Sequence, residues 1–302
     1  MKNMSLKKQD MITGYIFIAP FIIGFLVFIA GPMLFSLYAS FTNYNITSKF
    51  DFVGLRNYSH MFTKDQIFWT SFKNTIIFVV LGVPIFRIAA IALSILLNNT
   101  IKGMRVFRTI FYLPVVMSGV ATFLLWMQMF HPAYGLVNTV LSWVGIEGPA
   151  WLVDPFWTKP ALVLMGLWAA GGNMLLYLAR LKGIPQQLYE SAEIDGANGF
   201  HRLFKITIPM LTPIIFFDLI TGMIGAFQVF QSAYVMTGGQ GGGPMNSLLF
   251  YNYYLWNKAF KVFDMGYATA MSWFLFIVIM SVTVFNLKFS KKWVYYEGAD
   301  FE

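Results

Sequence analysis

The chain has 302 residues, of which 58% are apolar and only 11% carry a charge. A soluble domain carries about 25% charged residues, so this chain lacks the polar side chains needed to cover a water-exposed surface. It has no cysteine, which excludes disulfides and thiolate metal sites. The formal net charge of +8 does not indicate a nucleic-acid-binding protein, because the basic residues lie in small groups at the ends of apolar runs. Composition therefore predicts an integral membrane protein.

Six apolar runs follow one another along the chain, each long enough to cross a bilayer as a helix. They lie at about residues 15–37, 75–97, 110–130, 161–181, 211–236 and 265–287. The first run is too long for the core of a signal peptide and is followed by a poor cleavage site, so we expect it to remain as a span. Because no soluble domain interrupts the runs, the sequence predicts one all-α transmembrane domain over residues 1–302.

Lysine and arginine are distributed unequally between the two sets of connecting segments. The segments on the side of the N-terminus carry thirteen of them, and the opposite segments carry six. The first set comprises residues 1–13, 98–109, 180–208 and 286–302, and the second comprises residues 42–70, 131–160 and 237–264. Basic residues accumulate on the cytoplasmic side of membrane proteins. We therefore expect a multi-pass protein with both termini in the cytoplasm.

A polar segment from Gly183 to Pro213 stands between the fourth and fifth apolar runs. Pro185 suits the first turn of a helix, where its missing N–H is not needed. The following residues are good helix formers, and Asp195-Gly196 is typical of a turn. A second helical stretch is expected at about residues 199–207. The segment therefore predicts two short helices joined by a glycine turn on the cytoplasmic side.

This polar segment resembles the cytoplasmic loop of ABC importer permeases, whose pattern is E-A-A, D-G-A, an aromatic residue and then I-x-[LI]-P. The matching residues are Glu190, Ala192, Asp195, Gly196, Ala197, Phe204, Ile206 and Pro209. Ser191 stands where the pattern usually has its first alanine. Four other stretches are also similar to the family: FVGLRNY, NNTIKGMRVFRTIFYLP, TGGQGGGP and MGYATA. The likeness covers nearly the whole chain and is closest to the carbohydrate-uptake permeases of the maltose and glycerol-phosphate type.

The resemblance implies a fold, a function and a set of partners. The fold would be the six-helix permease core, with residues 183–208 as a coupling helix that docks in a groove of an ATPase subunit. The partners would be a second homologous permease, two ATPase subunits and an extracellular solute-binding protein. Together they would import a sugar or oligosaccharide across a prokaryotic cytoplasmic membrane. ATP and magnesium would bind to the ATPase subunits, so the resemblance implies no cofactor on this chain.

Polar side chains within the apolar runs are the candidates for a substrate path, because burying them in hydrocarbon is costly. They are Arg87, Gln128, Asn173, Asp218, Gln228 and Gln231, with Trp126, Trp168, Tyr177 and Tyr234 nearby. Amides and aromatic rings suit the hydroxyls and ring faces of sugars, but amides also hold membrane helices together. Gln228 and Gln231 are three residues apart, which would place them on one face of the fifth helix.

Arg87 and Asp218 are the two charges deepest in the apolar runs. Arg87 precedes Asn98 by 11 residues and Asp218 follows Met210 by 8. At the rise of an α-helix, these spacings put them about 16 Å and about 12 Å from the cytoplasmic ends of their helices. We expect the two side chains to approach each other, because a lone charge at that depth is unfavourable. The alternative is that Arg87 faces the cavity and binds a substrate carboxylate.

No set of residues indicates catalysis. His60, His131 and His201 are far apart and lack the spacing of metal ligands. The glycine run in 237–243 lacks the Gly-Lys-[Ser/Thr] of a phosphate-binding loop. The sequence therefore predicts neither an enzyme nor a metal site. The alternatives that remain are an ion-coupled transporter, which would need several carboxylates within the membrane, and an ABC permease for a non-carbohydrate solute.

Overall fold

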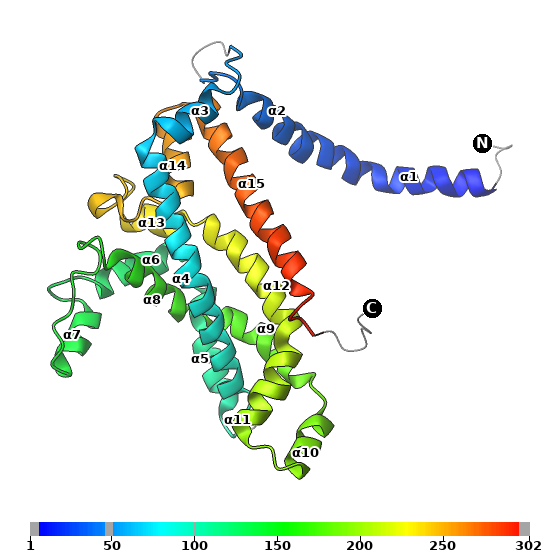
Figure 1. The fold of residues 1–302 in the computed structure, drawn as a ribbon, viewed down its shortest axis with the longest axis vertical. Coiled ribbons are helices and arrows are strands. Elements are labelled where there is room, and N and C mark those ends of the chain that lie inside the picture. Colours follow the sequence, from blue (N-terminus) through cyan, green and yellow to red (C-terminus); the bar gives the residue numbers. More distant parts are fainter. Residues whose placement is uncertain (1–5, 46–50, 100, 296–302) are drawn as a thin grey trace. The chain divides into compact units, whose positions relative to one another are not determined.

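The computed structural model describes residues 6–45, 51–99 and 101–295, which form helices and turns. Within these residues the strand-like pairings are two isolated bridges, Thr42 with Phe52 and Asn45 with Asp264. Figure 1 shows the helices coloured along the chain. The chain divides into two compact units. The first unit comprises residues 1–65 and 255–276, and the second comprises residues 66–254 and 277–302.

The first unit contains a long N-terminal helix and a small group of shorter helices. Its elements are α1 (Leu6–Phe25), a π-helical turn η1 (Leu26–Ala30), α2 (Gly31–Ala39), α3 (Arg56–Thr63), a π-helical turn η4 (Asn257–Lys261) and the first half of α15 (Met265–Ser290). Gly266 at the start of α15 lies against the α2–α3 loop, where an added Cβ would come within 2.2 Å of the Thr42 carbonyl oxygen. The Asn57 amide donates to the Ser40 and Thr42 carbonyls and fixes the same loop.

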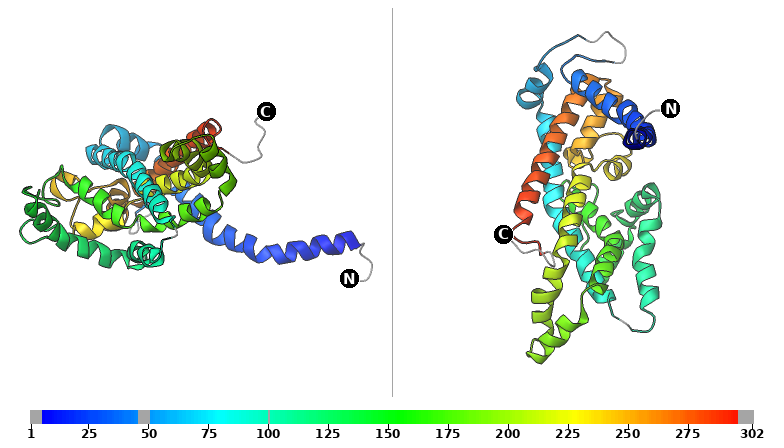
Figure 2. Two further views of the ribbon diagram at one scale, coloured as in Figure 1. Left: turned by 90° about the horizontal axis from the view of Figure 1, so that it is seen from below. Right: turned by 90° about the vertical axis from the view of Figure 1, so that its right-hand side faces the viewer.

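The second unit is a bundle in which α4, α9 and α12 pack against one another pairwise (Figure 2). Its elements are α4 (Gln66–Leu97), α5 (Met104–Val116), α6 (Gly119–Met129), α7 (Leu136–Trp143), α8 (Thr158–Trp168), α9 (Gly171–Lys182), α10 (Gln186–Ile194), α11 (Gly199–Arg202), η2 (Leu203–Thr207), α12 (Ile208–Phe227), α13 (Gln231–Met236), η3 (Pro244–Asn246), most of α14 (Tyr251–Trp256) and the second half of α15.

Among the described residues, four helices are long and apolar enough to cross a membrane. They run over Asp10–Ala39, Gln66–Leu97, Gly199–Phe227 and Met265–Ser290. The runs expected at 15–37, 75–97 and 265–287 lie inside three of them. The fourth helix begins earlier than expected, because residues 199–207 continue into the span and do not form a separate helix. Pro209 is the second residue of α12, and the π-helical turn η2 ends two residues before it, so the regular α-helical hydrogen bonding that a proline would interrupt is already altered there.

The third and fourth expected spans, at 110–130 and 161–181, are each a bent pair of helices and not one continuous helix. Helices α5 and α6 meet at 101°, because Met117 and Ser118 adopt extended backbone angles, with ψ of 146° and 131°. Helices α8 and α9 meet at 47°. The first residue of α9, Gly171, packs so closely on α5 that an added Cβ would lie 1.8 Å from the Phe111 carbonyl oxygen.

The fifth expected span, 211–236, is also wrong as a continuous helix. Helix α12 ends at Phe227, and α13 begins at Gln231 after a break in which Phe230 has φ of −143°. The Gln228 carbonyl at the end of α12 accepts a hydrogen bond of 3.2 Å from the Asn252 side chain, which replaces the helical partner it lacks. Gln228 and Gln231 therefore do not share a helix face.

Candidate functional site

A buried polar cluster joins three helices of the second unit. Arg87 of α4 places Nη2 3.1 Å from Asp218 Oδ1 of α12, and the same nitrogen donates to the Asp218 backbone carbonyl at 2.9 Å. From α9, Asn173 Nδ2 donates to Asp218 Oδ1 at 3.0 Å. Tyr177 Oη, one turn further along α9, donates to Asp218 Oδ2 at 2.7 Å. The Asp218 carboxylate is therefore the point at which α4, α9 and α12 are fastened together.

The two charged side chains of this cluster are buried, so each needs partners to replace the water it has lost. The side chains of Arg87 and Asp218 are only 10% and 4% exposed. A charge taken out of water is stabilised only if an opposite charge and hydrogen bonds replace its hydration. Asp218 meets this condition, because both of its carboxylate oxygens accept hydrogen bonds. Arg87 meets it less fully, since its Nε has no hydrogen-bond partner among the described residues.

Gly222 provides the space in which the arginine lies. It follows Asp218 by one helical turn on α12, so the two residues face the same neighbour. A Cβ added at Gly222 would lie 1.3 Å from Arg87 Nη2 and 2.1 Å from Cζ. The guanidinium group thus rests directly on the α12 backbone, and any larger residue would displace it.

The sequence predicted one contact of this cluster and missed others. The expected approach of Arg87 and Asp218 is present, with the ion pair buried in the bundle. Asn173 was a candidate for the substrate path, but its amide is used by Asp218. The parts played by Tyr177 and Gly222 were missed. Two spacings carried a signal for them: Asn173 and Tyr177 are four residues apart on α9, and so are Asp218 and Gly222 on α12.

The remaining substrate-path candidates lie on α6, α13 and the break before α13. Trp126 is buried, packs on Phe130 at 4.9 Å between ring centroids, and has no described partner for its Nε1–H. Gln128 sits near the end of α6, where its Oε1 accepts from the Tyr134 hydroxyl at 3.0 Å. Tyr234 packs on the rings of Phe230 and Tyr253, and Gln228 and Gln231 are exposed. Because α6 and α13 pack together, these residues form a second region separate from the Arg87 cluster.

The segment 183–208 folds into a helix with a glycine-capped end. At the end of α10, the Gly196 N–H donates to the Glu193 carbonyl at 3.1 Å, and the Ala197 N–H donates to the Ala192 carbonyl at 2.8 Å. Gly196 has φ of +78°, the left-handed conformation that this Schellman cap requires. Asn198 then caps α11 by accepting from the His201 N–H at 2.8 Å. The D-G-A motif thus has a local structural cause.

This glycine-capped segment exposes apolar side chains. Ile194 is 87% exposed, Phe200 is 72% exposed, and Phe200 and Phe204 pack ring to ring with centroids 4.5 Å apart. Glu190 and Asp195 are exposed beside them, whereas Ala192, Ala197 and Pro209 are half-buried. In Figure 1 and in the right-hand view of Figure 2, α10 and α11 lie at the lower end of the second unit, as does the connection between α4 and α5.

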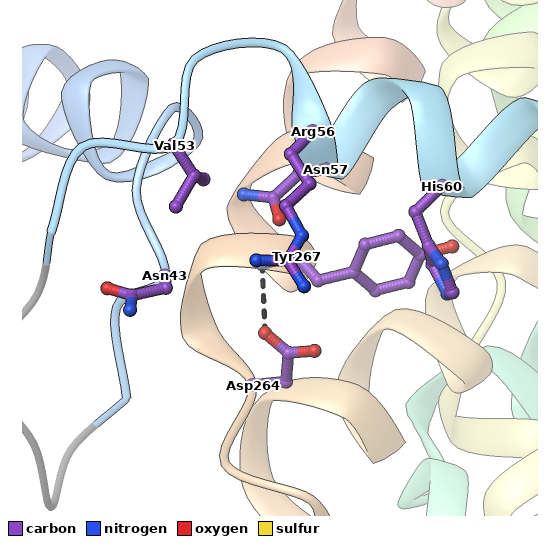
Figure 3. A pocket seen from close by; sticks show the side chains of 7 residues that line it. All are labelled: Asn43, Val53, Arg56, Asn57, His60, Asp264 and Tyr267. Atoms are coloured by element: carbon purple, nitrogen blue, oxygen red, sulfur yellow. Dashed lines mark hydrogen bonds between the residues drawn. The ribbon is translucent and has the colours of Figure 1, made fainter.

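A polar pocket of about 280 Å³ lies in the first unit (Figure 3). Arg56 and His60 of α3 face Asp264 and Tyr267 at the start of α15. Asp264 caps α15 by accepting from the Tyr267 N–H at 3.2 Å. The Tyr267 hydroxyl donates to Asp65 at 2.7 Å, and its ring meets the edge of His60. The His60–Tyr267 ring contact joins α3 to α15, and the Tyr267–Asp65 hydrogen bond joins α15 to the residues just after α3.

The described residues, 6–45, 51–99 and 101–295, contain no cluster of side chains that could bind a metal ion. Within them, no group of three or more His, Cys, Asp or Glu side chains lies close enough to hold a metal ion. The buried Arg87 cluster contains one carboxylate, already paired, and no nucleophile with an adjacent base. The geometry is that of a helix junction.

Comparison with known proteins places these features in a family. The model for "Binding-protein-dependent transport system inner membrane component" matches residues 68–294. The chain is 42% identical to the probable ABC transporter permease YesP of Bacillus subtilis, over 99% of this chain and 96% of that protein. It is 38% identical to the lactose transport system permease LacF of Rhizobium radiobacter, over 93% and 94%.

A solved structure with the same fold also matches. It is a chain from a bacterial alginate ABC transporter crystallised with an alginate pentasaccharide-bound periplasmic protein. It is 25% identical, with a TM-score of 0.77, covering 94% of this chain and 96% of that chain. The family is a transport component and not an enzyme family. The chain therefore belongs to the inner membrane components of binding-protein-dependent transport systems, the permeases of ABC transporters.

Proposed function

We propose that this chain is one of two permease subunits of an ATP-driven importer of a sugar or oligosaccharide. It crosses the prokaryotic cytoplasmic membrane six times, with each of the bent pairs α5–α6 and α8–α9 serving as one span. Residues 183–208 dock on an ATPase subunit, and an extracellular solute-binding protein delivers the substrate. ATP and magnesium bind to the ATPase subunits.

The observation that carries the proposal is the surface of the glycine-capped segment. Ile194 and Phe200 are apolar, largely exposed and held in place by two caps, at Gly196 and Asn198. Exposed apolar side chains on a fixed helix are typical of a surface that inserts into a partner's groove. In a permease of this family, that partner is the ATPase that supplies the energy for transport.

Carbohydrate as the substrate class is supported by two of the related proteins. LacF is named for lactose, and the alginate transporter was crystallised with an alginate-bound periplasmic protein. One is a neutral disaccharide and the other an acidic polysaccharide, so the relatives leave the charge of the substrate open. The pairing of Arg87 with Asp218 supports a structural role for this arginine over contact with a substrate carboxylate. The same pairing disfavours an ion-coupled transporter, which would need Asp218 free to bind a cation.

Changing Gly196 to proline tests the coupling role. Proline is restricted to φ near −65°, whereas Gly196 has φ of +78°, so the substitution breaks the Schellman cap and turns Ile194 and Phe200 away from their present positions. We expect normal insertion into the membrane but an at least tenfold loss of ATP-dependent uptake. The measurement is ATPase co-purification together with uptake into vesicles that contain the whole transporter.

Gly145 offers a matched control. It follows α7 with φ of +77°, and its N–H and that of Ile146 donate to Ser142 and Leu141 in the same Schellman pattern. Gly145→Pro should break an equivalent cap outside the docking segment and leave ATPase co-purification intact. Equal losses in the two variants, or native uptake by Gly196→Pro, would show that residues 183–208 do not couple ATPase to permease.

We also propose that both termini and residues 183–208 lie in the cytoplasm. Cysteine labelling tests this orientation, since the native chain has no cysteine. Ser142 of α7 and Gln187 of α10 are both exposed, and neither side chain caps a helix. A membrane-impermeant maleimide added to intact cells should label Ser142→Cys and should label Gln187→Cys only after the membrane is permeabilised. The opposite pattern would place residues 183–208 outside the cell and contradict ATPase docking.

A further inference from the structure

A basic pocket of about 640 Å³ lies where α4, α5 and α9 end or begin in the second unit. Its lining includes Lys102, Arg105, Arg108 and Lys182, and the described lining residues include no aspartate or glutamate. Asn98 and Asn99 add amide groups at the end of α4. Four positive charges gathered at one concave surface create a field that favours an anion.

Among the described residues, Arg108 is the one of these four cations whose side chain makes a hydrogen bond within the fold. Arg108 donates from Nε and Nη2 to the Leu97 carbonyl, at 3.1 Å and 2.6 Å, and so caps the C-terminus of α4. Lys102, Arg105 and Lys182 are exposed, and none of them makes an ion pair with a described residue. Their charges are therefore available to a ligand, while Arg108 fixes the wall on which they stand.

The side chains that follow Arg105 on α5 are apolar, which indicates that the ligand also has an apolar part. Val106, Phe107 and Ile110 are more than half exposed, within two turns of Arg105 and on the same helix. Exposed apolar side chains beside a basic cluster offer a surface that acyl chains can contact. The pocket therefore sits where a polar headgroup and its hydrocarbon chains would both find matching surfaces.

We propose that this basic pocket binds the phosphate of an anionic phospholipid headgroup, of the phosphatidylglycerol class. Clusters of lysine and arginine next to membrane helices on the cytoplasmic side are typical of such sites. The placement in the cytoplasmic leaflet rests on the orientation given under the proposed function, whereas the binding itself does not. Lys182 ends α9 directly before residues 183–208, so a bound headgroup would tie α5 to the base of the docking segment.

Native mass spectrometry of the full transporter complex tests this proposal with phosphatidylglycerol and phosphatidylcholine as probes. The wild type should retain phosphatidylglycerol in preference to phosphatidylcholine. The triple variant Lys102→Gln, Arg105→Gln, Lys182→Gln should weaken phosphatidylglycerol binding by about fivefold for each charge removed. Arg108 is left unchanged because it caps α4.

The matched control removes three other exposed lysines near the end of α15, as Lys288→Gln, Lys291→Gln, Lys292→Gln. It should retain phosphatidylglycerol as the wild type does. Equal losses in the two triple variants would mean a diffuse attraction of lipid to positive charge and would overturn the proposal. This readout needs no transport, so it stays informative even if the proposed substrate class fails.

Two further experiments distinguish the lipid headgroup from a soluble phosphate and from acidic residues of the ATPase. Inorganic phosphate, added to lipid-depleted complex, should not raise its melting temperature in a manner that depends on the three pocket cations. If it does, the pocket takes a soluble phosphate. Loss of ATPase co-purification in the pocket variant, with phosphatidylglycerol retained, would instead make the pocket a contact for acidic residues of the ATPase.

Discussion

Replacing Arg87 with methionine should destabilise the second unit by about 3–5 kcal/mol, the range found when one partner of a buried ion pair is removed. The reason is that Asp218 would keep its hydrogen bonds from Asn173 and Tyr177 but lose the positive charge that balances it. The measurement is the melting temperature of the purified complex, with assembly followed by co-purification. Arg56→Met is the control, because Arg56 is exposed and makes no ion pair with a described residue. Surface changes of that kind usually stay within about 0.5 kcal/mol.

A second substitution decides whether the effect is due to the pair. Arg87→Met with Asp218→Asn removes both charges and keeps an oxygen that can accept from Tyr177 and Asn173. The double variant should be more stable than the sum of the single changes predicts, by about 0.5–3 kcal/mol. An exchange of the two charges is a poorer test, since it would set a guanidinium group against the Tyr177 and Asn173 donors. Normal assembly of Arg87→Met with loss of uptake of acidic sugars alone would contradict the structural role and favour a substrate contact.

The approach of Arg87 and Asp218 could be predicted from the sequence because the rise of a helix converts residue number into distance from the end of the span. With a fixed rise per residue, Arg87 and Asp218 fall at similar heights, and a buried charge needs an opposite partner. The participation of Tyr177 was not accessible in the same way. Helix α9 belongs to a span that is apolar on most sides, so hydropathy does not say which of its faces meets α12.

The breaks in the spans were missed for a related physical reason. Hydropathy reports that a stretch prefers hydrocarbon, but it carries little information about backbone angles. The extended angles at Met117 and Ser118 and the break before Gln231 occur inside runs whose average composition stays apolar, so a window of hydropathy passes over them. The local structure of residues 195–199 was easier to predict, since Gly196 and Asn198 are residue types that favour a left-handed cap and a helix start.

Gly222→Ala should cost nearly as much stability as the loss of Arg87, although it adds a single methyl group. That methyl would occupy the place of the guanidinium, at 1.3 Å from Nη2, so Arg87 would have to withdraw from Asp218. We expect destabilisation by about 3–5 kcal/mol, measured again as melting of the complex. Gly225→Ala on the same helix is the matched control. An added Cβ there meets nothing within 4 Å, and alanine should stabilise a helix over glycine by about 0.5–1 kcal/mol.

The effect of Gly222→Ala on stability should change sign when Arg87 is also replaced. In an Arg87→Ala variant the guanidinium is absent, so Gly222→Ala no longer displaces it. The substitution should then stabilise the helix by about 0.5–1 kcal/mol, as at Gly225, because only the glycine-to-alanine term remains. A destabilisation of the same size in both backgrounds would mean that Gly222 is required for another contact. A reversal would show that the absence of a side chain at Gly222 is what lets the Arg87 guanidinium of α4 reach Asp218.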